Sequence, residues 1–166
     1  MVNKIRVILN TEEDVIRDVA INKEVTLEDL HNAITNAFGL TGNEMASFYR
    51  SDEEWVQGEE FPLFDMSEGL DSKIQMQDIT IEKVLESEND KLIYIYDFFN
   101  MWSFYVELIE VDFVVSNPEV PSLTFSLGAM PLNAPEIQFE SEDLSKDDND
   151  DEVEDYDEFD FDEYME

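Results

Sequence analysis

The chain has 166 residues and carries 43 acidic residues against nine basic ones, which gives a formal net charge of −34. This length suits one compact domain with a tail and is short for two ordinary domains. The absence of cysteine excludes disulfides, thiolate metal sites and cysteine nucleophiles, and the excess of carboxylates disfavours direct binding to nucleic acid or anionic lipid.

The N-terminal residues give an indication of the protein's location in the cell. The opening MVNKIRVILNTEEDV has charges within its apolar stretch and no small-residue cleavage site, so it does not resemble a signal peptide. No apolar run approaches the roughly 20 residues that a membrane-spanning helix needs. The sequence therefore predicts a cytoplasmic protein that has no membrane segment.

The first elements along the chain are a predicted hairpin and a helix. KIRVILN and DVIRDVAI are rich in β-branched residues, and TEE connects them, which predicts two paired strands. The next segment, TLEDLHNAITNAFG, has apolar residues at helical spacing. Thr26 is a suitable N-cap with Asp29 as its capping-box acid, and Gly39 suits a left-handed helix end.

Three shorter elements are predicted between this helix and the most apolar part of the chain. MASFYRS predicts a short strand, and EEWVQGEEFPLF predicts a second extended segment with a turn at Gly58. MQDITIEKVLES has the apolar spacing of a short helix, and SENDK predicts a turn after it.

The most apolar and aromatic stretch is KLIYIYDFFNMWSFYVELIEV, residues 91–111. It predicts two long strands in an antiparallel hairpin at the centre of a sheet, with alternate aromatic side chains in the core. The connection DFFNM must turn the chain: Asp97 and Asn100 suit a turn, whereas Phe98 and Phe99 are unusual in one. Residues 123–127 then predict an edge strand.

The composition changes near residue 140. Residues 1–139 predict an α+β domain, a mainly antiparallel mixed sheet of about five to seven strands with two helices packed on one face. Residues 140–166 hold 16 acids and one lysine, so we expect an acidic C-terminal tail that is disordered in isolation. Its aromatic residues are either incidental in a solubilising tail or anchors for a basic partner: Tyr156, Phe159, Phe161 and Tyr164.

Three segments together resemble a known family: TLEDLHNAITNAFGL, SFYRSDEEWVQGEEFPLFD and KLIYIYDFFNMWSFYVELIEV. They resemble the plasmid pRiA4b ORF-3-like family, also described as TnpR-type passenger proteins of insertion elements. The resemblance covers about residues 4–131 and implies a small α+β protein, without an activity to carry over. The positions that match the family's motifs are Leu30, His31, Tyr96, Asp97, Phe98, Trp102, Val106 and Leu108.

The departures from the family's pattern fall on its polar positions. The tryptophan expected after the helix is Leu40, and the histidine expected there falls at Glu44. In the hairpin, the expected Gly-Asp is Phe99-Asn100 and the expected histidine is Phe104. The resemblance therefore implies a divergent, acidic-tailed member that kept the apolar scaffold and altered any family pocket.

Four residues mark the candidate family site or pocket: His31, Asp97, Asn100 and Trp102. His31, the only histidine, suits either a general base or metal ligand, or a hydrogen-bonded structural role beside an apolar helix face. One histidine without cysteine excludes a zinc site of usual composition. Asp97 follows a buried strand, so partial desolvation would raise its pKa; alternatively, it caps the turn through backbone N–H groups.

The sequence shows no catalytic set, and three functions stay open. It has no glycine-rich phosphate loop, nucleophile elbow or Ser/His/Asp combination, so we expect a non-enzymatic protein without a cofactor or a built metal site. The leading hypothesis is an interaction or adaptor module for a basic protein partner. The alternatives are a small-molecule-binding or hydrolytic domain with a pocket near His31, Asp97 and Trp102, and a DNA mimic that uses the acidic surface.

Overall fold

The computed structural model describes residues 2–65, 72–112 and 120–135, which lie in the first of the two units into which the chain divides, residues 1–136 and 137–166. The predicted acidic tail, residues 140–166, lies outside the described residues, as do Tyr156, Phe159, Phe161 and Tyr164. Among the described residues, no helix has both the length and the apolar character needed to cross a membrane.

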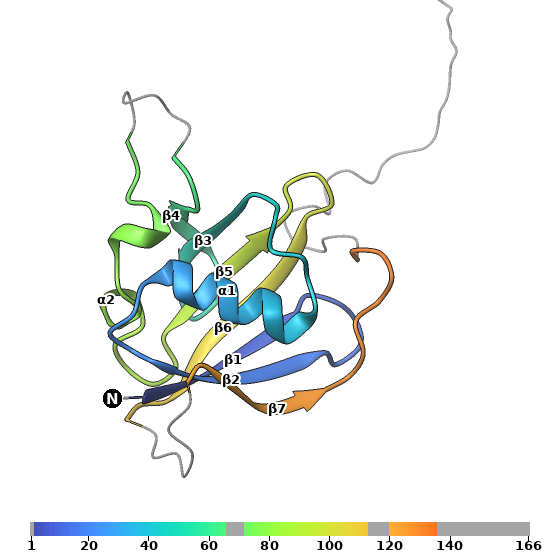
Figure 1. The fold of residues 1–166 in the computed structure, drawn as a ribbon, viewed down its shortest axis with the longest axis horizontal. Helices are drawn as coiled ribbons and strands as arrows, with labels where there is room; N and C mark the ends of the chain where they lie inside the picture. Colours follow the sequence, from blue (N-terminus) through green and yellow to red (C-terminus); the bar gives the residue numbers. More distant parts are fainter. Residues whose placement is uncertain (1, 66–71, 113–119, 136–166) are drawn as a thin grey trace, which may run out of the picture. The chain divides into compact units, whose positions relative to one another are not determined.

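The described residues form one seven-stranded sheet with a helix across one face (Figure 1). The strand order is β4-β3-β5-β6-β1-β2-β7, and every pairing is antiparallel. The predicted α+β class, with its mainly antiparallel sheet and two helices, is confirmed. The strands are β1 (Val2–Leu9), β2 (Ile16–Asn22), β3 (Ala46–Ser51), β4 (Gln57–Pro62), β5 (Lys91–Tyr96), β6 (Trp102–Glu110) and β7 (Ser122–Leu127).

Helix α1 (Leu27–Phe38) begins and ends as its sequence predicts. The Thr26 side chain accepts a hydrogen bond from the Asp29 backbone N–H, and Asp29 accepts one from the Thr26 backbone N–H, which completes a capping box. Gly39 ends the helix in the left-handed region, with φ 74°. The apolar side of the helix, including Leu30 and Ile34, is buried against the sheet.

The second predicted helix is much shorter than its sequence pattern indicates. Only the 3₁₀ turn η1 (Met76–Asp78) and the helix α2 (Ile81–Val84) form. Where the two meet, the chain instead pairs with the start of α1: Leu27 N–H donates to the Ile79 carbonyl, and Ile81 N–H donates to the Val25 carbonyl. This strand-like pairing interrupts the helix because it uses the backbone groups that a continuous helix would need.

The central hairpin of β5 and β6 supplies the aromatic core. Tyr94 of β5 lies opposite Phe104 of β6 in register, and their ring centroids are 5.7 Å apart. The Phe104 ring also lies 4.7 Å from that of Phe38 on α1, and the Tyr94 ring lies 4.7 Å from that of Phe48 on β3. All four rings are buried, so these hairpin aromatics are packing material, as predicted.

The prediction of a turn at Gly58 is wrong. Gly58 lies within β4, and the chain reverses at residues 52–55. There Asp52 Oδ1 accepts hydrogen bonds from the backbone N–H groups of Glu54 and Val56. The turn places Trp55 against Tyr105, with ring centroids 4.7 Å apart. Tyr105 alternates with the inward-facing residues of β6, so Trp55 lies on the sheet face opposite α1.

Candidate functional site

His31 lies on the buried side of α1, and its side chain contacts the central hairpin. Its side chain is buried (2% exposed), and its Nδ1 lies 2.6 Å from the Tyr94 hydroxyl. Burial lowers the pKa of His31 and raises that of Tyr94 well above its ordinary value, because a charged form of either group would lose its hydration. The pair is therefore neutral, and the hydrogen bond between them satisfies His31 Nδ1 and the Tyr94 hydroxyl.

The His31 environment predicts a specific pH dependence of stability. A histidine with a lowered folded-state pKa stabilises the fold fully above its unfolded pKa of about 6.5, and this contribution falls as the pH drops toward the folded value. We expect His31→Asn, which can retain a hydrogen bond to Tyr94, to remove this component. Urea unfolding of both proteins at several pH values between 7.5 and 5 measures it. The slopes of the free energy of unfolding against pH should differ by up to about 1.4 kcal/mol per pH unit. Identical slopes in both proteins would contradict it.

Tyr96 lies near two of the predicted site residues, His31 and Trp102, on the α1 side of the sheet. Its hydroxyl accepts a hydrogen bond from the Gly42 backbone N–H and lies 3.0 Å from the Thr41 hydroxyl, which fixes the loop after α1. The His31 ring centroid is 6.5 Å from that of Tyr96. Trp102 lies opposite Tyr96 in the hairpin register and packs against the core. His31 and Trp102 therefore both lie near Tyr96.

Asp97 and Asn100 form the turn between β5 and β6. Asp97 has φ 65°, and its Oδ1 accepts hydrogen bonds from the backbone N–H groups of Phe99 and Asn100. The Asn100 side-chain amide donates to Asp97 Oδ2 at 2.7 Å. This bond is the main reason that the pKa of Asp97 is lowered. The expectation of a raised pKa is wrong, because the carboxylate is hydrogen-bonded at an exposed turn and not desolvated.

The four predicted site residues therefore lie in two places. Asp97 and Asn100 bond to each other at the hairpin turn, whereas His31 and Trp102 lie on the core side of the sheet. Among the described residues, no hydrogen bond or ion pair joins His31 to Asp97, and no group of three or more His, Cys, Asp or Glu side chains could hold a metal ion. The grooves on the surface of the described domain are lined by other residues.

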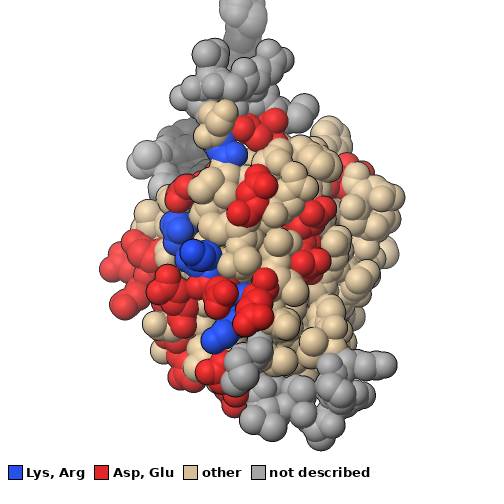
Figure 2. All heavy atoms as spheres, turned by 60° about the vertical axis from the view of Figure 1, so that its left-hand side comes forward, with Lys and Arg blue, Asp and Glu red and all other residues tan. Residues whose placement is uncertain are grey.

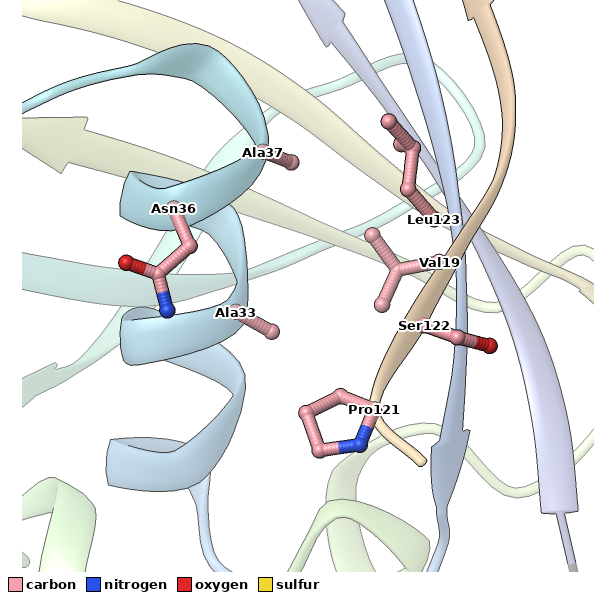
Figure 3. Close-up of a pocket in the computed structure, with 7 residues that line it drawn as sticks. All are labelled: Val19, Ala33, Asn36, Ala37, Pro121, Ser122 and Leu123. Atoms are coloured by element: carbon pink, nitrogen blue, oxygen red, sulfur yellow. The ribbon is translucent and has the colours of Figure 1, made fainter. Parts of the chain in front are cut away.

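An apolar groove runs between α1 and the edge of the sheet (Figure 3). Ala33 and Ala37 of α1 face Val19 of β2 and Leu123 of β7 across a space of about 190 Å³. A second space of about 310 Å³ shares Ala33 and Pro121 and has a more polar end. The groove exists because the helix presents two short side chains four residues apart toward β7. The spacing of the alanines and the strand itself are visible in the sequence, but the placement of that strand opposite α1 is not.

An acidic groove of about 470 Å³ lies between the β3–β4 turn and the turn that precedes β5. Two of its carboxylates, Asp52 and Asp90, also accept backbone N–H groups in these turns. Its two basic residues are already paired, Arg50 with Glu59 and Lys91 with Glu107. The sequence signal was the density of acids in DEE and ESEND. The residues lining the groove are Arg50, Ser51, Asp52, Glu53, Val84, Glu88, Asn89, Asp90 and Lys91.

The basic side chains of the fold are mostly neutralised by nearby carboxylates. Of the eight lysines and arginines in the described ranges, six form ion pairs. Figure 2 shows one face of the molecule, on which blue basic groups are bordered by red acidic ones. The pairs are Lys4–Glu110, Arg6–Asp18, Lys23–Asp112, Arg50–Glu59, Lys73–Glu60 and Lys91–Glu107.

Comparison with known proteins places the chain in a family. A solved structure described as a protein of unknown function, MM3350 from Methanosarcina mazei Go1, is similar in fold, with a TM-score of 0.59. The two chains are 18% identical over 75% of this chain and 68% of the other. No curated protein matches the sequence. The family model described as plasmid pRiA4b ORF-3-like protein matches residues 2–165, nearly the whole chain. The protein therefore belongs to the plasmid pRiA4b ORF-3-like family, as its helix and hairpin motifs indicated.

Proposed function

We propose that this protein is a non-enzymatic interaction module that binds a basic protein partner. The observation that carries the proposal is the imbalance of charge on the folded domain. Six of the eight described basic side chains are held by carboxylates of the same chain, while Glu53 and Glu88 of the acidic groove have no ion-pair partner among the described residues. A positively charged partner would supply the missing opposite charge.

The acidic groove is the part of the domain that suits a lysine or arginine side chain from a partner. Its volume of about 470 Å³ admits such a side chain, and four acidic residues line it: Asp52, Glu53, Glu88 and Asp90. A unit charge 4 Å from a carboxylate gains about 1 kcal/mol in water and about 4 kcal/mol at a protein surface. Several such contacts would give specificity and fast association, and added salt would weaken them.

The composition of the acidic tail suits the same basic partner. Residues 140–166 carry 16 acids, which would extend the attraction for a basic partner beyond the domain. The aromatic residues Tyr156, Phe159, Phe161 and Tyr164 would anchor the tail on an apolar groove of that partner. A comparison of partner recovery by the full chain and by a chain that ends at residue 139 measures this contribution, and equal recovery would remove the tail from the proposal.

A charge-reversal experiment tests the acidic groove. We expect Glu53→Lys/Glu88→Lys to weaken binding of a fluorescently labelled lysine-rich peptide about tenfold or more, since each reversal replaces attraction by repulsion. Glu12→Lys/Glu13→Lys is the matched control, because both glutamates are exposed and the change in net charge is the same. Fluorescence anisotropy at low salt measures both proteins. If the two variants lose equal affinity, binding depends on net charge and not on the groove.

A further inference from the structure

Strand β7 is the last strand of the sheet, and no strand among the described residues pairs with its outer side. It is hydrogen-bonded to β2 on one side and is the last strand in the order of the sheet. Such an edge presents free backbone N–H and C=O groups that can pair with another strand. Its side chains are also unusually exposed for apolar residues: Leu123 is 50%, Phe125 44% and Leu127 45% exposed.

The opposite edge of the sheet is protected, and β7 is not. Strand β4 carries Glu59 and Glu60 and ends at Pro62, which are features that discourage pairing between edges. Residues 120–135, in contrast, contain no charged residue, although 31% of the whole chain is charged. Two basic side chains lie beside β7, and both are already engaged. Arg6, whose guanidinium lies 5.9 Å from the Phe125 ring centroid, is paired with Asp18. The buried Arg17 guanidinium donates hydrogen bonds to the backbone carbonyls of Ile16, Ala37 and Leu127.

The sequence of β7 is self-complementary. Residues 123–127 read LTFSL, so an antiparallel copy centred on Phe125 places Phe125 opposite itself and Thr124 opposite Ser126. In a dimer with two-fold symmetry, the same patch of both copies meets, so that patch must be complementary to itself. A bulge between Asp18 and Val19 in the pairing with β2 directs Leu123 toward the α1 groove, so Phe125 and its two neighbours form the centre of the contact.

We propose that two copies of this chain pair through β7 and form a dimer in which the two sheets are continuous. Because β7 carries no charged side chain, it is the edge at which two copies of a chain with net charge −34 can approach without opposing carboxylates at the contact. The carboxylates elsewhere on each copy still repel one another, so the dimer becomes tighter as salt screens them. Binding to a basic partner weakens as salt is added, which is the opposite dependence. A result that contradicts one of the two proposals therefore does not contradict the other.

Sedimentation equilibrium of the full chain tests the dimer. We expect a monomer–dimer equilibrium that tightens several-fold between about 0.05 and 0.5 M NaCl. A chain that stays monomeric at about 0.5 M NaCl and up to about 0.2 mM protein would overturn the proposal. That result would leave the basic-partner proposal standing, because the latter rests on attraction that salt weakens.

Matched lysine substitutions locate the contact. Phe125→Lys places two ammonium groups opposite each other at the two-fold axis, and we expect it to weaken the dimer at least about tenfold. Val56→Lys, at a residue that is 58% exposed beside the other edge strand, makes the same change in charge and should leave the dimer unchanged. Leu127→Lys serves as a second edge variant if Phe125→Lys perturbs the thermal unfolding. Dimers of unchanged affinity in both edge variants would overturn the assignment to β7.

Discussion

Phe104→Ala is expected to lower the free energy of unfolding by about 3–5 kcal/mol. The Phe104 side chain is fully buried at the centre of the sheet, between the rings of Phe38 and Tyr94. Truncation removes its apolar surface from the core and leaves a cavity, because the helix above and the strands beside it are held by their own hydrogen bonds. Urea unfolding followed by circular dichroism measures the loss.

The same hairpin offers a matched control for Phe104. Phe99 is 93% exposed at the turn, so Phe99→Ala should change the free energy of unfolding by no more than about 0.5 kcal/mol. The comparison separates aromatic residues that build the core from those that only border solvent. A loss below about 1 kcal/mol for Phe104→Ala would mean that the core does not depend on the aromatic layer of the hairpin.

Gly128→Ala is expected to cost about 2–4 kcal/mol and to loosen the attachment of β7. Gly128 has φ 83°, and a Cβ there would overlap the backbone carbonyl oxygen of Asp14. Both the left-handed conformation and the close approach of the two backbones therefore require glycine. Hydrogen exchange of the β7 amides, together with urea unfolding, measures the effect.

Gly39 provides the control for Gly128 because it shares the backbone conformation without the clash. Its φ is 74°, and nothing lies within 4 Å of an added Cβ. Gly39→Ala should therefore cost only the left-handed strain, about 1 kcal/mol, and should leave the exchange of β7 amides unchanged. Equal losses of unfolding free energy from the two substitutions would show that the overlap with Asp14 adds nothing to the cost of Gly128→Ala.

The central hairpin and α1 could be predicted because their signals are local. The alternation of Trp102, Phe104, Val106 and Leu108 with more polar neighbours reflects the two-residue period of a strand, and the structure buries Phe104, Val106 and Leu108 fully. The capping box and Gly39 likewise depend on residues within one turn of the helix. The family motifs lie mostly on these two elements, which explains why the resemblance was recognisable.

Most of the features that could not be predicted from the sequence depend on partners distant in the chain. The second helix is interrupted because Ile79 and Ile81 pair with the chain at the start of α1. The lowered pKa of Asp97, in contrast, depends on a local contact with the side chain of Asn100, but in a turn whose backbone geometry the sequence does not specify. The α1–β7 groove requires two alanines to face a strand about 90 residues later, a pairing that no local propensity encodes.

The placement of the two tryptophans gives the domain two natural optical reporters. Trp55 stacks on Tyr105, with the Lys91 ammonium 5.5 Å from its ring centroid, whereas Trp102 packs against the core on the other side of the sheet. The chain has only these two indoles. Replacing either one with phenylalanine isolates the emission of the other, so events beside the acidic groove and events inside the core can be followed separately in unlabelled protein.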